Sequence, residues 1–297
     1  MPNKIEINAY AKINLALEIL KRRADGFHEI MSIIQTISLY DRLVICAHES
    51  LKVTMENLDI PAEENLAFKA ALVLRELTGC HKGANVLICK RIPLSSGLGG
   101  GSSDAAAVLR GLNELWELGL SLKKLERIAS NLGSDVPFFI RGGTALIEGR
   151  GEKVRPIPDT KETWYFLLIP QSHMKNKTRN MFSLIETDNL TKGFLTRKLE
   201  TRLRFGGDLP SELIFNGFDS LAQKSFPDLD KFRNIMEALG GKKAHLSGSG
   251  PALYCRVSSE AIGKAMQALA QHKYNIEAYV VRSIEANAAD SIWKQLT

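Results

Sequence analysis

Several features that would narrow the class of protein are missing from this chain of 297 residues. Its four cysteines form no C-x-x-C pair, so their spacing favours free thiols in a reducing cytoplasm over a zinc site or a disulfide framework. No apolar run is long enough to span a bilayer, and the first residues lack the basic-then-apolar pattern of a signal peptide. The sequence therefore predicts a cytoplasmic protein with no membrane partner.

An excess of charge of one sign is also missing, because the formal net charge is only +6 and the basic residues are scattered. Only residues 192–204 concentrate them, and such a run is more typical of a solvated helix face than of a nucleic-acid patch. The composition, 44% hydrophobic and 24% charged, is that of a globular protein long enough for two domains. We expect no nucleic-acid partner, a small polyanionic substrate such as ATP, and a monomer or weak homodimer.

What the chain does have is a glycine-rich stretch at residues 93–107, Pro-Leu-Ser-Ser-Gly-Leu-Gly-Gly-Gly-Ser-Ser-Asp-Ala-Ala-Ala. The apolar run Asn85–Ile92 predicts a buried strand before it, and Ala105–Leu118 predicts a helix after it, with Ser102–Asp104 as helix-start residues. Glycines permit positive φ and close approach, and unpaired N–H groups at a helix start attract anions. The order strand, glycine loop, helix predicts a cradle for nucleotide phosphates.

Other interpretations of the glycine loop fit less well. It is not a Walker A loop, because no Gly-Lys-Ser/Thr closes it. The dinucleotide-binding fingerprint needs a third glycine where Ser102 stands, and it usually opens a chain, whereas about 90 residues precede this loop. A tight turn that binds nothing is the remaining alternative. Four glycines and four serines within nine residues make a turn alone a poor explanation.

Strands and helices are mixed along the chain, which predicts an α+β fold of layered sheets and helices. Proline and turn residues at 156–160 mark a candidate boundary between a first domain, 1–157, and a second, 158–297. In the first domain we expect strands at Lys4–Asn8, Leu15–Leu20 and Met31–Leu39, helices at Glu63–Leu77 and Ser121–Leu132, and a hairpin at Gly142–Ile157. In the second we expect strands at Trp164–Ile169, Ala244–Ser247, Ala252–Val257 and Ile276–Ile284, with helices at Asp228–Leu239 and Ser259–His272.

The glycine loop resembles the ATP loop of the galactokinase, homoserine kinase, mevalonate kinase and phosphomevalonate kinase superfamily. Three further segments resemble one family within it, the 4-diphosphocytidyl-2-C-methyl-D-erythritol kinases of the non-mevalonate isoprenoid pathway. These segments are Ala9–Leu15 (Ala-Tyr-Ala-Lys-Ile-Asn-Leu), Arg22–Ile30 (Arg-Arg-Ala-Asp-Gly-Phe-His-Glu-Ile) and Gly133–Phe139 (Gly-Ser-Asp-Val-Pro-Phe-Phe). A fourth, Leu246–Ala252, is similar to the superfamily's glycine-rich motif near the C-terminus. The matches follow the family's order over most of the chain.

The resemblance implies a two-domain fold, with a ribosomal-S5-like ATP-binding domain at 1–157 and a ferredoxin-like, substrate-side domain at 158–297. The active site would lie in the cleft between them. It also implies an activity: ATP-dependent phosphorylation, with Mg²⁺, of the 2-hydroxyl of 4-(cytidine 5′-diphospho)-2-C-methyl-D-erythritol.

Carried over residue by residue, the resemblance makes Asp135 the general base and a substrate contact, and Lys12 the catalytic lysine. Asn14 would share a strand face with Lys12, because side chains on a strand repeat with a period of two, and it is therefore expected to bind the same substrate. In the family an aromatic residue and a histidine recognise cytosine, here Phe27 by stacking and His28 by hydrogen bonds. No residue is assigned to a metal. The expected ATP-binding residues are Pro93, Leu94, Ser95, Ser96, Gly97, Leu98, Gly99, Gly100, Gly101, Ser102 and Ser103.

Each assignment has an ordinary structural alternative. Asp135 could simply cap a helix before Pro137, and Lys12 could be a solvent-facing member of a half-buried strand. Residues 247–250 could be only a turn, and Asn65 could cap a helix instead of contributing to adenosine binding. In the second domain, the segment Pro170–Phe182 departs from the family pattern. Its candidate contacts are a second aromatic wall from Phe182 or Met174, and a family threonine at Thr178.

Three rival functions remain open on the sequence. Another kinase of the superfamily, for homoserine or mevalonate, would have no base for Phe27 and His28 to bind. A non-catalytic ATP-binding sensor would have no need for both Lys12 and Asp135. A dinucleotide-dependent oxidoreductase is the most distant rival, and it would bind NAD rather than ATP.

Overall fold

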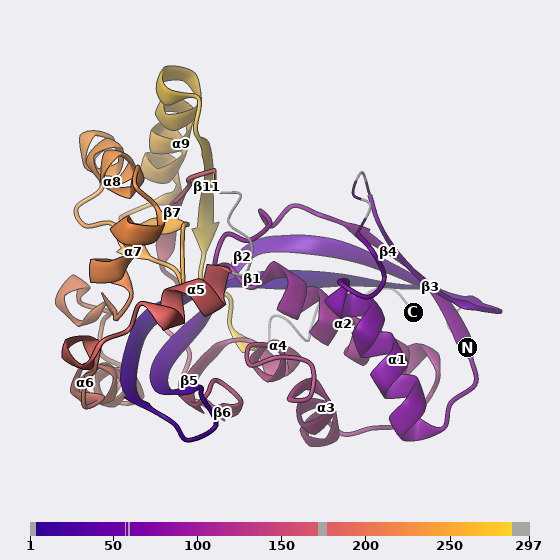
Figure 1. The fold of residues 1–297 in the computed structure, drawn as a ribbon. Helices are drawn as coiled ribbons and strands as arrows, with labels where there is room; N and C mark the ends of the chain where they lie inside the picture. The colour runs from indigo at the N-terminus through magenta and orange to yellow at the C-terminus, as the bar shows by residue number, and fades with distance from the viewer. Residues whose placement is uncertain (1–3, 57, 59, 172–176, 287–297) are drawn as a thin grey trace.

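Two β-sheets with helices packed on them form the part of the chain that the computed structural model describes, residues 4–56, 58, 60–171 and 177–286 (Figure 1). The first sheet has the order β3-β4-β2-β1-β8, with β5 paired to β2 and β6 paired to β5. Its strands are β1 Lys4–Arg22, β2 His28–His48, β3 Leu51–Met55, β4 Gly83–Cys89, β5 Thr144–Gly149, β6 Lys153–Pro156 and β8 Phe215–Asn216. The second sheet has the order β11-β7-β10-β9, with strands β7 Trp164–Ile169, β9 His245–Leu246, β10 Leu253–Val257 and β11 Glu277–Arg282.

The helices form two groups, α1–α4 and α5–α9, that lie toward opposite sides of the molecule (Figure 1). In the first group α2 packs on β1 and β2 and is surrounded by the others: α1 Leu66–Thr78, α2 Gly100–Leu115, α3 Leu122–Ala129 and α4 Val136–Arg141. In the second group α9 packs on the second sheet: α5 Lys177–Ser183, α6 Phe194–Arg204, α7 Asp219–Ser225, α8 Leu229–Ala238 and α9 Glu260–Tyr274. Within the described ranges, no helix combines the length and the apolar character needed to cross a membrane.

The hairpin of β1 and β2 is the longest feature of the fold. The strands expected at Lys4–Asn8 and Leu15–Leu20 are parts of the single strand β1, 19 residues long. The segment between them, Ala11–Leu17, is buried on both faces, and that burial hides the alternation by which a strand is recognised. Register shifts after Tyr10, Asn14 and Ile19 mark irregularities of the ladder, which increase local bend and twist. The middle of β1 therefore lies inside the molecule.

Helix boundaries agree with the sequence at some ends and differ at others. Ser121 caps α3, as predicted. Asn65 caps α1 by accepting bonds from the N–H groups of residues 67 and 68, which is the structural alternative left open for it. The prediction that Ser102–Asp104 start α2 was wrong, because the helix begins at Gly100 after a left-handed Gly99. The side chains of this segment are used elsewhere, since the Ser103 hydroxyl donates to the Tyr10 carbonyl at 2.7 Å. Helix α3 also ends at residue 129, earlier than expected.

In the second half, the four predicted strands and the two predicted helices are confirmed as β7, β9, β10, β11, α8 and α9. The sequence reasoning missed α5, α6, α7 and the short strands β3 and β8. Strand β8 pairs in parallel with β1 at residues 16 and 17, so the C-terminal half also adds a strand to the first sheet. The division of the chain at residue 157 stays a prediction. The four cysteines are free thiols, as expected: Cys46, Cys80, Cys89 and Cys255.

Candidate active site

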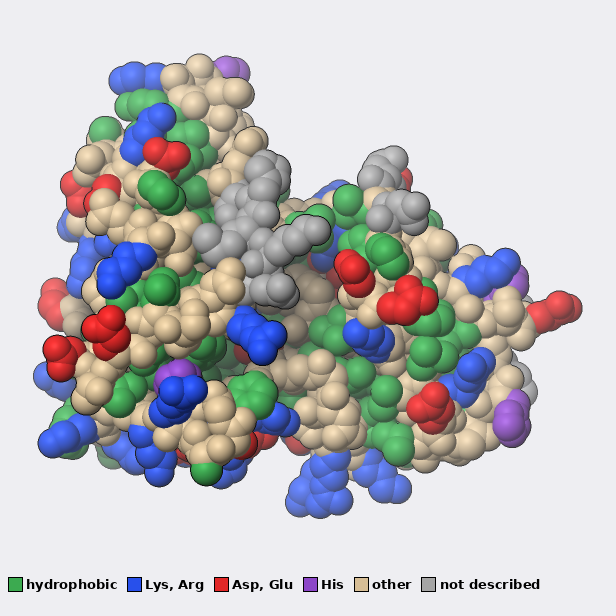
Figure 2. Space-filling view, in the orientation of Figure 1, with side chains coloured by type: hydrophobic (Ala, Val, Ile, Leu, Met, Phe, Trp, Pro, Cys, Tyr) green, Lys and Arg blue, Asp and Glu red, His purple; other side chains and the backbone are tan. Residues whose placement is uncertain are grey.

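A cleft of about 1410 Å³ lies between the glycine loop, the middle of the β1–β2 hairpin and helix α5. Figure 2 shows basic side chains at the border between the two parts of the molecule. The cleft is larger than the roughly 300–1,000 Å³ typical of a pocket for one drug-sized ligand, so it has room for two substrates. Most of the residues expected in the site line it: Lys12, Asn14, Phe27, His28, Pro93, Leu94, Ser95, Ser96, Gly97, Gly99, Gly100, Gly101, Ser102 and Asp135.

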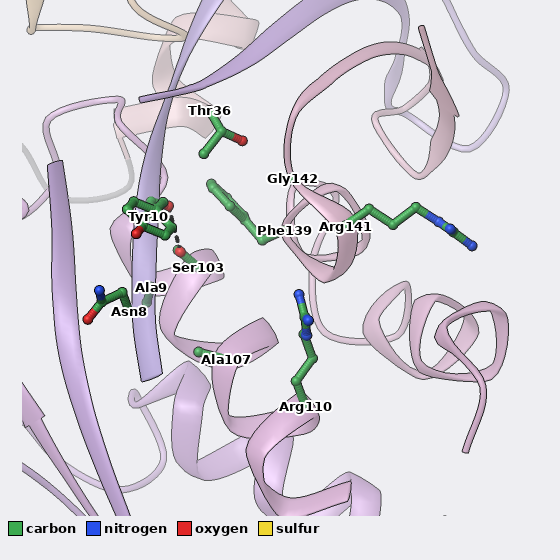
Figure 3. Close-up of a pocket in the computed structure, with 10 residues that line it drawn as sticks. All are labelled: Asn8, Ala9, Tyr10, Thr36, Ser103, Ala107, Arg110, Phe139, Arg141 and Gly142. Carbon is green, nitrogen blue, oxygen red and sulfur yellow. Dashed lines mark hydrogen bonds between the residues drawn. The ribbon is translucent and has the colours of Figure 1, made fainter. Parts of the chain in front are cut away.

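Three of the residues proposed from the sequence have side chains used elsewhere. Leu98 is fully buried in a hydrophobic core. Ser103 lies on the side of α2 that faces β1, where a small second cavity is lined by Tyr10, Ser103 and Phe139 (Figure 3). Asn65 is buried at the start of α1 with its carboxamide bonded to the helix. Leu98 and Ser103 therefore support the glycine loop from behind.

The glycine loop folds tightly against the loop at residues 247–250. Gly97 has φ +92°, and a Cβ atom there would lie 2.3 Å from the carbonyl oxygen of Ser247, a distance that no side chain can adopt. The Ser247 hydroxyl donates to the Gly97 carbonyl at 3.1 Å, and the Lys12 N–H donates to the Leu98 carbonyl at 3.0 Å. The loop is thus held between β1 and residues 247–250, so these residues do more than form a turn.

Helix α2 begins where the glycine loop ends, and no side chain caps its first turn. Gly99 occupies the N-cap position with φ 77°, and Gly100–Ser102 line the cleft. The first N–H groups of a helix have no partner within it, and the helix dipole places partial positive charge there. An uncapped helix start of this kind, open to a cleft, is suited to binding an anion such as phosphate.

Lys12, Asn14 and Ser32 form a buried chain of hydrogen bonds in the first sheet. The Lys12 ammonium donates to Asn14 Oδ1 at 2.7 Å, and Asn14 Nδ2 donates to Ser32 Oγ at 2.9 Å. Ser32 Oγ donates in turn to the Ala16 carbonyl at 2.6 Å. Lys12 is only 4% exposed, and burial lowers the pKa of its ammonium. The structure therefore puts Lys12 and Asn14 on one side of β1, and Lys12 is not a solvent-facing residue.

Asp135 stands directly before α4, in which Pro137 occupies the first turn. Its carboxylate makes no capping hydrogen bond to the helix. Instead, Oδ2 lies 3.7 Å from the Lys12 ammonium, with about a third of the side chain exposed to the cleft. This ion pair acts on the pKa of Lys12 in the direction opposite to burial. The geometry favours a carboxylate that is available to a ligand over an ordinary helix cap.

Aromatic rings gather at the other end of the cleft. The His28 ring stacks on Phe182 with centroids 5.3 Å apart and an angle of 18°, and Phe182 meets Phe218 edge to face at 4.9 Å. Burial and the neighbouring Arg22 lower the pKa of His28, so its imidazole is neutral near pH 7. A neutral ring offers one donor and one acceptor nitrogen. Phe27, half exposed, has the Arg150 guanidinium 5.1 Å from its ring centre.

Of the two candidates for a second aromatic wall, Phe182 is beside His28, and Met174 lies outside the described residues. Thr178 also lines the cleft, with its hydroxyl 3.0 Å from Ser249 Oγ. Both residues belong to α5, which the sequence reasoning did not predict.

Two buried lysines of the site were missed. Lys90 donates to Asp41 Oδ2 at 2.5 Å and to Asp104 Oδ2 at 2.7 Å. Asp41 Oδ1 also accepts bonds from the N–H groups of Arg91 and Ile92, so this cluster fixes the residues that lead into the glycine loop. Strand β4 accordingly ends at residue 89, earlier than predicted. Burial raises the pKa of Asp104.

Lys177, at the start of α5, is the second missed lysine. Its ammonium donates to the carbonyls of Ser95, at 2.6 Å, and of Gly250. Burial, with a smaller effect from Lys12, lowers the pKa of this ammonium to about 7. Nothing in the sequence indicated either lysine, because a lysine's contacts across the fold leave no local pattern.

Comparison with known proteins gives consistent matches. The family model for the GHMP kinases N terminal domain matches residues 65–143, and the model for the GHMP kinases C terminal matches residues 206–275. A 4-diphosphocytidyl-2-C-methyl-D-erythritol kinase of Dehalococcoides mccartyi is 44% identical over 247 residues, which cover 83% of this chain and 87% of that protein. The enzyme of the same name from Listeria innocua is 35% identical over 297 residues, covering 97% and 99%. A crystal structure of 4-(cytidine 5′-diphospho)-2C-methyl-D-erythritol kinase superposes with a TM-score of 0.80 at 30% identity, covering 94% of this chain and 99% of that one.

Proposed function

We infer that this chain, which belongs to the 4-diphosphocytidyl-2-C-methyl-D-erythritol kinase family of the GHMP kinases, phosphorylates 4-(cytidine 5′-diphospho)-2-C-methyl-D-erythritol with ATP. The phosphoryl group goes to the 2-hydroxyl, a step of isoprenoid precursor biosynthesis by the non-mevalonate route. The observation that carries this inference is the arrangement of one cleft. A glycine loop and helix start suited to phosphate lie at one end, stacked rings suited to a nucleobase at the other, and the Lys12–Asp135 pair also lines it.

ATP is the phosphoryl donor, as in GHMP kinases generally. We assign its phosphates to the loop Pro93–Ser103 and to the start of α2, where no side chain caps the first N–H groups of the helix. Gly97 and Gly99, both with positive φ, let the backbone approach the phosphates closely. Leu98 and Ser103 contribute by holding the loop rather than by direct side-chain contact.

Mg²⁺ fits the proposed ATP site by the chemistry of its donors. The Ser102 hydroxyl lines the cleft beside the loop assigned to the phosphates, and a hard oxygen ligand of this kind suits Mg²⁺ bound mainly through substrate phosphates. When bound, the ion would screen the negative charge of the β- and γ-phosphates.

The acceptor hydroxyl is activated by Asp135 and Lys12. Asp135 takes the hydroxyl proton as the oxygen attacks the γ-phosphorus; the new O–P bond forms as the bond to ADP breaks. The Lys12 ammonium, fixed by Asn14, offsets the negative charge that develops on the transferred group. Positioning and electrostatics, rather than a covalent intermediate, supply the catalysis.

The cytosine is assigned to the pocket of Phe27, His28 and Phe182. The neutral His28 imidazole matches the donor and acceptor groups on the edge of the base, and the phenyl ring of Phe27 stacks on its face. Family members usually carry tyrosine at the position of Phe27, so the stacking is kept here while any hydroxyl contact is lost.

The proposal is tested by measuring ATP consumption by the purified protein with Mg²⁺ and one alcohol at a time. The cytidylated substrate, mevalonate and homoserine are offered separately. Turnover of the cytidylated substrate alone is expected. Turnover of another alcohol would keep the kinase but refute the base pocket, and ATP binding without turnover would favour the sensor. A cytoplasmic location, a monomer or weak homodimer, and the lack of nucleic-acid or membrane partners belong to the proposal as well.

A further inference from the structure

One lysine in the cleft joins three segments that are far apart in the sequence. Lys177 begins α5, and its ammonium reaches the carbonyl of Ser95 in the glycine loop at 2.6 Å and that of Gly250 in the 247–250 loop. Among the described residues, Ser95 is one of three non-glycine residues with positive φ, here 52°. Positive φ is uncommon for a residue with a side chain, and this backbone conformation helps to set where the Ser95 carbonyl points. The side chain of Lys177 lines the cleft, although the residue is only 7% exposed.

The charge of Lys177 is not neutralised by the described part of the chain. The two carbonyls are dipoles, and no carboxylate among the described residues forms an ion pair with Lys177. The charged group that lowers the pKa of Lys177, besides burial, is another cation, Lys12, whose own partner is Asp135. The junction therefore holds two ammonium groups and one carboxylate. A buried ammonium without a counter-ion is strongly unfavourable, so an anionic ligand in the cleft would supply the negative charge that the described residues do not.

We propose that Lys177 is a phosphate-binding residue of this kinase, whose ammonium contacts the phosphates of bound ATP from helix α5. Two of its three protons are used by the carbonyls of Ser95 and Gly250, which leaves one for a phosphate oxygen. The same bonds hold the ammonium beside the glycine loop. This inference rests on the proposed function for the identity of the ligand, ATP.

The proposal has a consequence for proton binding. Burial lowers the pKa of free Lys177 to about 7, so the group is mostly neutral at pH 8. Contact with phosphate raises that pKa again, and the site takes up a proton as ATP binds. At pH 8 the uptake approaches about 0.9 proton per site. Other ionisable groups lie in or behind the cleft. Burial also lowers the pKa of Lys12, against the opposing effect of Asp135, and it raises the pKa of Asp104, which is bonded to Lys90, to about 7. The lowered pKa of His28 keeps its imidazole neutral at this pH. The part of the uptake that belongs to Lys177 is therefore the part that a variant lacking its ammonium loses.

Isothermal titration of the full chain with Mg-ATP at pH 8, in buffers of different ionisation enthalpy, measures this uptake directly. In Lys177→Gln, the amide still donates to a backbone carbonyl but carries no charge. We expect proton uptake to disappear and the Kd for ATP to rise about 10- to 100-fold, the loss of one charge-assisted hydrogen bond. Lys198→Gln, on the exposed face of α6, removes the same charge outside the cleft and should change neither quantity.

If Lys177→Gln binds ATP with the Kd and the proton uptake of the wild type, the proposal is overturned. The charge of Lys177 would then have no part in ATP binding, and the hydrogen bonds to the two carbonyls would be its whole role. Lys177→Met tests the charge a second time, and the melting temperatures show whether both variants fold. If neither folds, the wild type decides: uptake that rises from pH 6 to 8 around a midpoint near 7 supports the proposal, and no uptake overturns it. These results do not depend on the acceptor alcohol. A wild type that binds ATP but phosphorylates no cytidylated substrate would refute the proposed function and leave this inference standing.

Discussion

The Asp135→Asn variant tests the chemistry most directly, because it keeps the size of the side chain and removes its charge. In the structure, the carboxylate Oδ2 lies 3.7 Å from the Lys12 ammonium. At an effective dielectric constant near 20, the attraction between unit charges at that separation is about 4.5 kcal/mol. The substitution thus removes both the proposed base and the counter-ion of Lys12. Since burial already lowers the pKa of Lys12, losing Asp135 lowers it further.

A general base contributes about 10²- to 10⁴-fold to the rate, so we expect kcat to fall by about 10³-fold or more. The Kd for ATP should change less than about threefold, because the ion pair of Asp135 is with Lys12 and not with the glycine loop assigned to the phosphates. Release of ADP, measured at saturating cytidylated substrate, gives kcat, and titration calorimetry gives the Kd. Near-normal kcat in the Asp135→Asn variant would refute the assignment of the base. A loss of ATP affinity equal to the loss of kcat would instead make Asp135 a binding residue.

The same pair predicts non-additivity. Lys12→Met alone leaves the carboxylate without its ammonium, and the double variant leaves neither charge. When two groups act as one unit, the first substitution already removes most of their joint contribution to kcat. The kcat of the double variant should therefore be only slightly below that of the slower single variant. Fully multiplicative losses would mean that Lys12 and Asp135 act independently.

Three further predictions concern the loop, the base pocket and acid stability. Gly97→Ala should lower the melting temperature and ATP affinity, because its Cβ would meet the Ser247 carbonyl at 2.3 Å, whereas Gly101→Ala, with no protein atom within 4 Å of its Cβ, should leave the melting temperature unchanged. Phe182→Ala should raise KM for the cytidylated substrate about 10- to 100-fold with a smaller effect on kcat, as expected for a lost stacking partner, whereas the exposed Phe205→Ala should not. Burial lowers the pKa of His245 to about 4, so the unfolded chain binds the extra proton between pH 6.5 and 4, and stability falls as pH falls through this window by up to about 3 kcal/mol. Denaturant titration of His245→Gln should lack that component; an unchanged pH dependence would disprove the assignment.

Where the sequence was informative, the signal was local. Caps such as Asn65 and Ser121 work within one turn of their own helix, and the glycine loop, its preceding strand and its helix are contiguous in the chain. The position of Lys12 beside Asn14 also follows from the period of a strand. Its burial does not, because β1 is covered on both faces by elements from both halves, and no pattern within the strand records that.

Helix α5 was missed for a different reason. It is seven residues long, and its apolar side chains serve partners in other elements: Phe182 packs on His28 of β2 and on Phe218 before α7. A segment so short has little helical periodicity to detect, and its stability comes from tertiary contacts. The most difficult part of the base pocket to predict is thus the part formed by a short helix against a distant hairpin.

The three buried lysines of the cleft differ in how the described residues neutralise them, and this difference separates their roles. Lys90 has two carboxylates within 2.7 Å, so its charge is fully used inside the protein and it serves to fix the glycine loop. Lys12 has one carboxylate, at 3.7 Å, which is close enough for one substrate hydroxyl in the cleft to contact both groups. Lys177 has only carbonyls. A buried ammonium needs a counter-ion, and the negative charge that the described residues supply decreases from Lys90 to Lys12 to Lys177. This order matches a structural role for Lys90, the proposed catalytic role for Lys12 and the proposed phosphate-binding role for Lys177.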